Sequence, residues 1–177
     1  AQKNGHKVLL CTGRQRIEIF GPMLKIDYDA IIAGSGATIE CDHEIIEENA
    51  LSKEESEYLT KYLLDRNIPA NFESSTKIYA NQFTKDTMLK KVEEQCKGKS
   101  EEEKAKHGLT ILTSQITVVD SLEGLSYNKV SVIDNGKTPY KTIQEDLSDR
   151  YVVIPATFAP LGKESGEITS FHINKAT

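Results

Sequence analysis

The fold of this chain is decided by the stretch Lys7-Val8-Leu9-Leu10-Cys11-Thr12-Gly13-Arg14. Residues 8–11 form an unbroken apolar run, and the residues before them are polar and include Gly5, as at a helix end that turns into a strand. A run without polar alternation is typical of a strand that is covered on both faces of a parallel sheet. We therefore predict a buried parallel strand over residues 8–11.

Three residues that could bind a ligand, Thr12, Gly13 and Arg14, follow this strand directly. They lie at its carboxyl end, where open α/β sheets place their ligand sites. A hydroxyl, a glycine that lets the backbone come close and a guanidinium together suit an anion such as phosphate. Taken alone, these residues are equally compatible with an ordinary loop after a buried strand.

Two further segments belong with this stretch. Residues 29–39 read DAIIAGSGATI, a second apolar run that ends in a glycine-rich turn, and residues 166–177 contain a strand pattern that ends in Asn174-Lys175. In this order and at these distances, the three segments resemble the haloacid dehalogenase (HAD) superfamily of phosphohydrolases, and within it the Cof-type, subfamily IIB sugar-phosphatase branch. Ser35 stands where that branch usually has Asn.

The resemblance implies an α/β fold. We expect part of a HAD-like Rossmannoid parallel-sheet core plus an inserted α+β cap domain, a sheet with helices on one face. Residues 1–49 would be the partial core, residues 50–165 the cap, and residues 166–177 the last cap strand returning to the core. The family's first segment, Asp-x-Asp-Gly-Thr, and its fourth, Gly-Asp-x-x-Asn-Asp, have no counterpart in the sequence. The chain therefore resembles an internal fragment.

The resemblance also implies an activity. The parent protein would be a magnesium-dependent phosphatase that hydrolyses a small phosphorylated metabolite, such as a sugar phosphate, through an aspartyl-phosphate formed outside this chain. Mg²⁺ would be held mostly by residues outside it, and the chain alone would be inactive. The implied catalytic residues are Thr12 and Lys175, and the implied substrate-binding residues are Gly13, Arg14, Ser35, Gly36 and Ala37.

Other functions stay open at this point. The chain could be a non-catalytic ligand-binding or interaction module with a cap-like fold, or part of a related phosphosugar mutase or glycosyl-phosphate phosphatase. Asp27-Tyr28-Asp29 has Asp-x-Asp spacing but precedes a strand, at the wrong end of the sheet for a nucleophile. Asp134-Asn135-Gly136 is typical of a turn. Cys41 and His43 are too few ligands for a zinc site.

Composition narrows the class of protein. With 38% hydrophobic and 28% charged residues, the sequence is typical of a soluble globular protein. The formal net charge of −5 argues against a nucleic-acid partner, and no run approaches the roughly 18 apolar residues of a membrane span. Three widely spaced cysteines favour reduced thiols in the cytoplasm over a disulfide framework.

Local patterns predict the remaining elements. Ser52 and Glu55 form a capping box at the start of a helix. Residues 97–106 are nearly all polar, which indicates either a solvated helix surface or a mobile connector. Residues 109–119 are rich in Thr, Ile and Val, which favours an irregular strand. We also expect a hairpin over residues 38–46, strands over residues 70–73, 77–80, 129–133, 151–155 and 167–173, and helices over residues 84–96 and 138–147.

Overall fold

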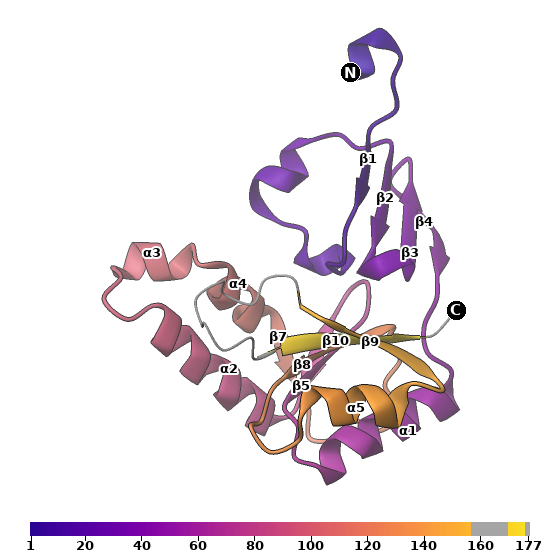
Figure 1. The fold of residues 1–177 in the computed structure, drawn as a ribbon. Coiled ribbons are helices and arrows are strands. Elements are labelled where there is room, and N and C mark those ends of the chain that lie inside the picture. The colour runs from indigo at the N-terminus through magenta and orange to yellow at the C-terminus, as the bar shows by residue number, and fades with distance from the viewer. Residues whose placement is uncertain (157–169, 176–177) are drawn as a thin grey trace.

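The protein, seen here in a computed structural model that describes residues 1–156 and 170–175, is built on two β-sheets. The smaller sheet stands above the larger one in Figure 1, with the carboxyl ends of its first two strands directed toward the larger sheet. Strand order is β1-β2-β3-β4, with β1 and β2 parallel and the other neighbours antiparallel. Its strands are β1 (Leu9–Cys11), β2 (Ala30–Ala33), β3 (Thr38–Cys41) and β4 (Glu44–Glu48).

The larger sheet has the order β7-β6-β5-β8-β10-β9. Its neighbours are antiparallel except for the parallel pair β6 and β7. The central strands β5, β8 and β10 come from distant parts of the sequence. The last described strand, β10, lies between β8 and β9, so the sheet is complete only with β10 in place. Its strands are β5 (Ala70–Glu73), β6 (Ile78–Ala80), β7 (Ile116–Val118), β8 (Lys129–Ile133), β9 (Tyr151–Pro155) and β10 (Ser170–Lys175).

Most of the predicted elements are confirmed, including the hairpin of β3 and β4. The predicted strand over residues 167–173 corresponds to β10, and residues 166–169, 176 and 177 of the third family-like segment lie outside the described residues. The helices of the described residues are α1 (Lys53–Asp65), α2 (Gln82–Gln95), α3 (Glu101–Ala105), α4 (Gly108–Gln115) and α5 (Tyr140–Leu147), with short 3-10 helices η1 (Gln2–Asn4), η2 (Arg16–Glu18), η3 (Gly21–Lys25) and η4 (Gly34–Gly36).

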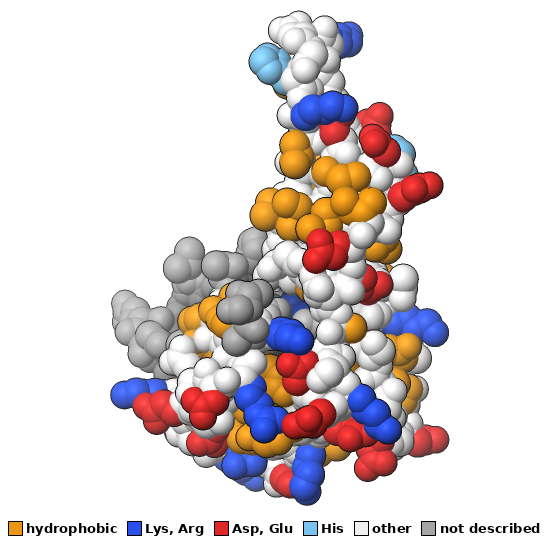
Figure 2. All heavy atoms as spheres, turned by 90° about the vertical axis from the view of Figure 1, so that its right-hand side faces the viewer, with side chains coloured by type: hydrophobic (Ala, Val, Ile, Leu, Met, Phe, Trp, Pro, Cys, Tyr) orange, Lys and Arg blue, Asp and Glu red, His pale blue; other side chains and the backbone are white. Residues whose placement is uncertain are grey.

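The prediction that the first strand is covered on both faces was wrong. β1 is an edge strand in the described part of the chain, and Leu9 is 56% exposed. One face of the smaller sheet is covered because Ile19 and its neighbours in the segment between β1 and β2 pack on Ile31 and Ala33. Among the described residues no such cluster covers the opposite face, and Figure 2 shows hydrophobic side chains gathered over this sheet.

The larger sheet carries the main hydrophobic core on one face. The capping box begins α1 as predicted: the Glu55 N–H donates to Ser52 Oγ (3.2 Å) and the Ser52 N–H donates to a Glu55 carboxylate oxygen (2.7 Å). The apolar side of α1, with Leu59 and Leu63 fully buried, then packs on the sheet beside α5. Figure 1 places both helices on the side of the larger sheet away from the smaller sheet.

The other face of the larger sheet is polar in its centre. Side chains alternate along a strand, so Phe72 and Val130 enter the core while their sequence neighbours point the opposite way. Helices α2 and α4 contact this face around Ile78, and the cluster there also includes Ile133 at the end of β8. The polar side chains that share the central part are Asn71, Glu73, Lys129, Ser131, His172 and Asn174.

The prediction of an irregular strand over residues 109–119 was wrong for most of its length. The structure has helix α4 there, followed by the three residues of β7. Leu109 and Leu112 pack against Met88 and its cluster, and the Thr113 hydroxyl donates to the Leu109 carbonyl (2.7 Å). Tertiary packing and a local hydrogen bond thus outweigh the β propensity of the sequence.

The polar segment over residues 97–106 contains a solvated helix. Helix α3 begins with a second capping box, between Ser100 and Glu103, and none of its residues is buried. Of the two readings of this segment, the structure thus selects the helix surface. Within the described residues, every helix is too short or too polar to cross a membrane.

Two leucines on α1 provide a test of the core. Leu59→Ala should destabilise the protein by about 3 kcal/mol, because a fully buried side chain is removed and a cavity is left. Leu64→Ala is the matched control, since Leu64 is 39% exposed on the same helix and should cost less than about 1 kcal/mol. Urea unfolding at constant slope measures both. Equal losses would contradict the packing described here.

Candidate active site at the junction of the two sheets

The residues that follow β1 form a tight turn at the edge of the smaller sheet. The Thr12 N–H donates to the Ile32 carbonyl (2.9 Å), which extends the parallel pairing of β1 and β2 by one residue. The Arg14 N–H then donates to Thr12 Oγ1 (3.1 Å). Thr12 is half-buried and Gly13 is exposed. The prediction that Thr12 lies at the carboxyl end of a strand in a parallel pair is therefore confirmed.

The turn after β2 interlocks with the turn after β1. The Ser35 N–H donates to the Thr12 carbonyl (3.2 Å), and the Gly34 N–H donates to the Arg14 carbonyl (2.7 Å). Gly34 has φ +59°, and a Cβ there would lie 2.8 Å from Gln15 Oε1, so the close approach of the two turns requires glycine. The carboxyl ends of two neighbouring parallel strands thus meet, as in α/β ligand sites.

The other predicted substrate-binding residues lie beside this pair of turns. Ser35 is exposed, and its Oγ would be 3.4 Å from a Cβ built on Gly13. Gly36 and Ala37 are half-buried, and the Ala37 carbonyl accepts the Asn49 N–H (2.8 Å). The structure therefore brings Ser35 against Thr12 and Gly13, and Gly36 and Ala37 follow Ser35 in the same turn. Their contact with a substrate stays a prediction.

Arg14 turns toward the chain that follows it. Its Nη1 donates to the Glu18 carbonyl (3.4 Å), and its guanidinium carbon lies 5.5 Å from the centre of the Phe20 ring. These contacts orient the guanidinium along η2. A role for Arg14 in substrate binding stays a prediction.

Lys175 ends β10 on the side of the larger sheet where α1 begins. Its Nζ donates to a Glu55 carboxylate oxygen (3.2 Å), and the side chain is 47% exposed. The pKa of Glu55 is lowered first by the Ser52 N–H, with a smaller effect of Lys175. Among the described residues, no hydrogen bond joins Lys175 to Thr12. The catalytic role of Lys175 stays a prediction.

A buried charge cluster, made of Glu18, Glu73 and Lys129, lies directly beneath the Thr12 turn. Lys129 Nζ is 2.8 Å from Glu73 Oε2 and 3.5 Å from Glu18 Oε2, and it donates to the Gly13 carbonyl (3.0 Å). The side chains of Glu73 and Lys129 are 0% and 2% exposed. This cluster was not predicted from the sequence. Its only sequence signal is that Lys129 and Ser131 alternate with buried valines.

The ammonium and the carboxylates of this cluster shift one another's pKa values. Burial alone would lower the pKa of Lys129, but Glu73 and Glu18 outweigh burial and raise it, so the ammonium stays charged. Burial raises the pKa of Glu18, and the neighbouring Glu73 carboxylate raises it further, against the opposing effect of Lys129. The charge cluster is thus a buried, strongly ionic layer between the two sheets.

Amide side chains continue the contact around this cluster. Gln15 Nε2 donates to Asn128 Oδ1 (2.5 Å), and both side chains are buried. Asn128 Nδ2 in turn lies 3.5 Å from Thr38 Oγ1 on β3. The Ile17 N–H donates to the Ser75 carbonyl (3.1 Å). The two sheets therefore meet through polar groups that fix their relative position.

The two Asp-containing motifs considered for the nucleophile, at residues 27–29 and 134–136, have structural roles. Asp29 lies at the amino end of β2, where its carboxylate accepts from the Val8 N–H (2.8 Å) and from Lys7 Nζ (2.7 Å). Lys7 and the Val8 N–H hold the pKa of Asp29 at about 2. Asp134 accepts the Gly136 N–H (2.9 Å) in a turn. Neither carboxylate lies at the carboxyl end of a parallel strand beside Thr12.

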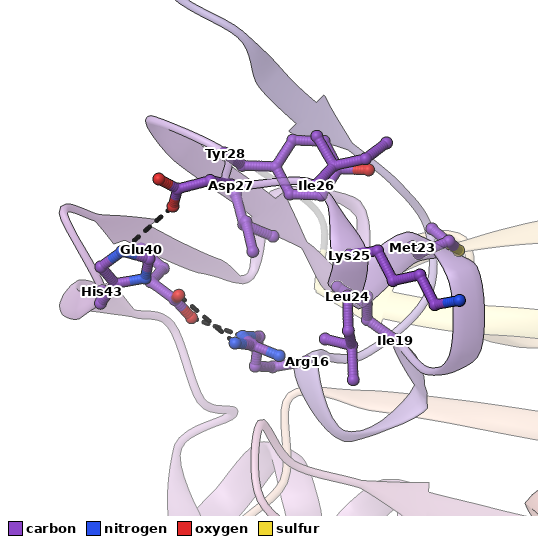
Figure 3. A pocket seen from close by; sticks show the side chains of 11 residues that line it. Arg16, Ile19, Met23, Leu24, Lys25, Ile26, Asp27, Tyr28, Glu40 and His43 are labelled. Carbon is purple, nitrogen blue, oxygen red and sulfur yellow. Dashed lines mark hydrogen bonds and ion pairs between the residues drawn. The ribbon is translucent and has the colours of Figure 1, made fainter.

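A pocket of about 210 Å³ lies elsewhere on the smaller sheet (Figure 3). Arg16 and Glu40, joined by an ion pair of 2.5 Å, form part of its wall, and His43 lies 3.4 Å from Asp27 at its rim. Thr12 does not line it. Across residues 1–156 and 170–175, no three His, Cys, Asp or Glu side chains gather as a metal site would require.

The model of the haloacid dehalogenase-like hydrolase family matches residues 1–177, so the chain belongs to that family. No curated protein matches the sequence. Solved structures do match. One is a haloacid dehalogenase-like hydrolase from B. subtilis, with 14% identity and a TM-score of 0.69, and the match covers 99% of this chain and 63% of that one.

Two phosphatases are also among the similar structures. One, of the haloalkanoate (HAD) enzyme superfamily from Bacteroides thetaiotaomicron, has 14% identity and a TM-score of 0.66, over 99% of this chain and 56% of its own. The other, a HAD subclass IIB sugar phosphatase, has 13% identity and a TM-score of 0.61, and the match covers 98% of this chain and 58% of that one. At such identities the likeness concerns the fold. The chain spans about three fifths of the length of these structures.

His172 gives the junction a pH dependence that can be measured. Burial, and next the Lys129 charge, lower the pKa of His172 from 6.5 to about 4, against a smaller effect of Glu18. Its Nδ1 lies 2.9 Å from Ser131 Oγ. Because the unfolded chain binds this proton at higher pH, the folded state loses stability as the pH falls from 6.5 toward 4.

His172→Gln should therefore reduce the acid destabilisation over this range by about 2 kcal/mol, measured by urea unfolding at a series of pH values. The raised pKa of Glu18 acts in the opposite sense, because the folded state takes up that proton first, but it is common to both proteins. His6→Gln, at an exposed position, is the control and should keep the wild-type pH dependence. Parallel curves for wild type and His172→Gln would refute the assignment.

Proposed function

We propose that this chain is the central part of a HAD-like phosphatase that hydrolyses a small phosphorylated metabolite. In this proposal residues 1–49 belong to the catalytic core, residues 50–165 form the inserted cap, and residues 166–177 lead back to the core. The nucleophilic aspartate and the remaining core segments would lie outside this chain, which spans only part of the length of the similar structures.

The observation that carries the proposal is the paired turn at the carboxyl ends of β1 and β2. Thr12 Oγ1 accepts the Arg14 N–H, so one lone pair of the hydroxyl is engaged and its own proton is left for another acceptor. A phosphoryl oxygen placed at this edge of the sheet would be such an acceptor. Catalysis of phosphoryl transfer depends mainly on positioning and on charge stabilisation, which a fixed hydroxyl can provide.

Lys175 would supply positive charge to the same phosphate and to the nucleophile. Its side chain is half exposed and reaches Glu55 by a single hydrogen bond, so it can exchange this partner for another anion at low cost. Surface ion pairs of this kind contribute at most about 1 kcal/mol. Gly13, Ser35, Gly36 and Ala37 would line the entrance between the two sheets.

Mg²⁺ is the cofactor that the family implies. Among the described residues, no three His, Cys, Asp or Glu side chains lie close enough together to hold it. The metal ligands, like the nucleophile, would come from the rest of the parent protein. What the present residues contribute is the Thr12 hydroxyl, the Lys175 ammonium and the shape of the entrance.

The polar face of the larger sheet supports a hydroxyl-rich leaving group such as a sugar. Asn71 Oδ1 and Asn174 Oδ1 are buried there without a hydrogen-bond partner among the described residues. Carboxamides, the Ser131 hydroxyl and the His172 imidazole can all pair with sugar hydroxyls.

The free state of Cys11, Cys41 and Cys96 supports a reducing, cytoplasmic location.

The test uses the full-length parent protein with a generic phosphate ester and Mg²⁺. Thr12→Val should lower kcat about 100-fold, because a hydrogen-bond donor to the transferring phosphoryl group is lost. Thr12→Ser should retain most of the rate, since it keeps the hydroxyl. Thr76→Val, at an exposed turn, is the control and should leave the rate unchanged.

Two results would contradict the proposal. Turnover by the 177-residue chain alone would place the nucleophile within it. Binding of phosphate esters by the full-length protein without hydrolysis would favour a non-catalytic binding module instead.

A further inference from the structure

One ammonium group contacts both sheets at the candidate site. Lys129 begins β8 in the larger sheet, and its closest charged partner, Glu73, lies on the neighbouring strand β5. Its other two partners, the Gly13 carbonyl and the Glu18 carboxylate, belong to the segment that follows β1 in the smaller sheet. The ammonium thus has partners on both sides of the junction, a hydrogen bond to the Gly13 carbonyl and ion pairs with Glu73 and Glu18.

The contact with Gly13 fixes the orientation of one peptide group. The Gly13 carbonyl and the Arg14 N–H belong to the same peptide plane, and the described residues contain no cis peptide bond. In a trans peptide these two groups point in opposite directions. When Lys129 holds the carbonyl from below, the Arg14 N–H is directed to the other side, where it donates to Thr12 Oγ1 (3.1 Å).

We propose that Lys129 is a positioning residue that sets the orientation of the Thr12 hydroxyl through the Gly13–Arg14 peptide group, so that the anion site is complete only when the larger sheet is docked against it. The catalytic consequence rests on the proposed function. The structural part, that Lys129 holds this peptide group, stands independently of what the site binds.

Charge and burial explain why a lysine serves here. An ammonium that is 2% exposed is costly to desolvate, and the nearby carboxylates of Glu73 and Glu18 compensate this cost. A neutral donor could reach the carbonyl but would leave two buried carboxylates close together without a counter-ion. Buried ionic groups of this kind contribute to a specific geometry more than to net stability. The docked position of the two sheets is therefore well defined.

The experiment is amide hydrogen exchange on the 177-residue chain, read residue by residue. Lys129→Met alone would leave Glu73 and Glu18 buried without a counter-ion, so the main variant is the double substitution Lys129→Met with Glu73→Gln, which removes the more deeply buried of the two carboxylates. Exchange of the Arg14 amide should become about tenfold faster, the change expected when a hydrogen bond to a charged group is lost. The Ile133 N–H at the end of β8 donates to the Pro69 carbonyl, away from the junction, and this amide should keep its exchange rate.

A matched control replaces an exposed ion pair of the same chemistry. Lys61 and Asp65 are joined at 2.8 Å on the surface of α1, and Lys61→Met with Asp65→Asn should leave Arg14 exchange unchanged. Glu73→Gln alone is the milder second variant. It keeps the ammonium and should raise Arg14 exchange by a smaller factor. An Arg14 amide that exchanges at the wild-type rate in both Lys129 and Glu73 variants would overturn the proposal.

A double-mutant cycle in the full-length protein separates positioning from stability. The Lys129→Met, Glu73→Gln variant should lower kcat about tenfold with little change in KM. In a Thr12→Val background the same change should have no further effect on kcat, because the hydroxyl that it orients is gone. Additive losses would indicate a merely structural role. If the full-length protein has no phosphatase activity, the proposed function fails, while the exchange experiment still decides the role of Lys129.

Discussion

The relation between the two sheets depends on one buried ammonium between two carboxylates. Lys129 faces Glu73 and Glu18 at 2.8 and 3.5 Å, and all three side chains are at most 10% exposed. In such a layer, water cannot replace a lost partner, so each charge fixes the place of the others. The hydrogen bond to the Gly13 carbonyl then extends this order to the turn that holds Thr12.

The two faces of the larger sheet have different roles, because side chains alternate along each strand between the apolar core and the junction of the two sheets. Phe72 and Val130 enter a core with α1 and α5, and their neighbours Glu73 and Lys129 enter the junction. A shift of one residue in the pairing of β5 with β8 would exchange these roles and bury charge in the apolar core. Hydrophobic packing on one side therefore sets the register that places the ionic groups on the other.

Local features of the structure could be predicted from the sequence, and long-range ones could not. The capping box of Ser52 and Glu55 and the hydrogen bond from the Arg14 N–H to Thr12 Oγ1 join residues that are close in the chain, which the sequence displays directly. The helix over residues 108–115 depends on packing against α2, and Leu9 is exposed because its surroundings are set by topology. Glu18, Glu73 and Lys129 each look ordinary in sequence, and only the fold makes them partners.

The buried cluster also restricts how such a chain can evolve. A lineage cannot replace the ammonium by a single neutral step without leaving two buried carboxylates unmatched in the interior. Positions 18, 73 and 129 should therefore covary among descendants of a common ancestor. Where the lysine has been lost, we expect the acidic side chains to have been lost with it, and another donor to have taken over the Gly13 carbonyl.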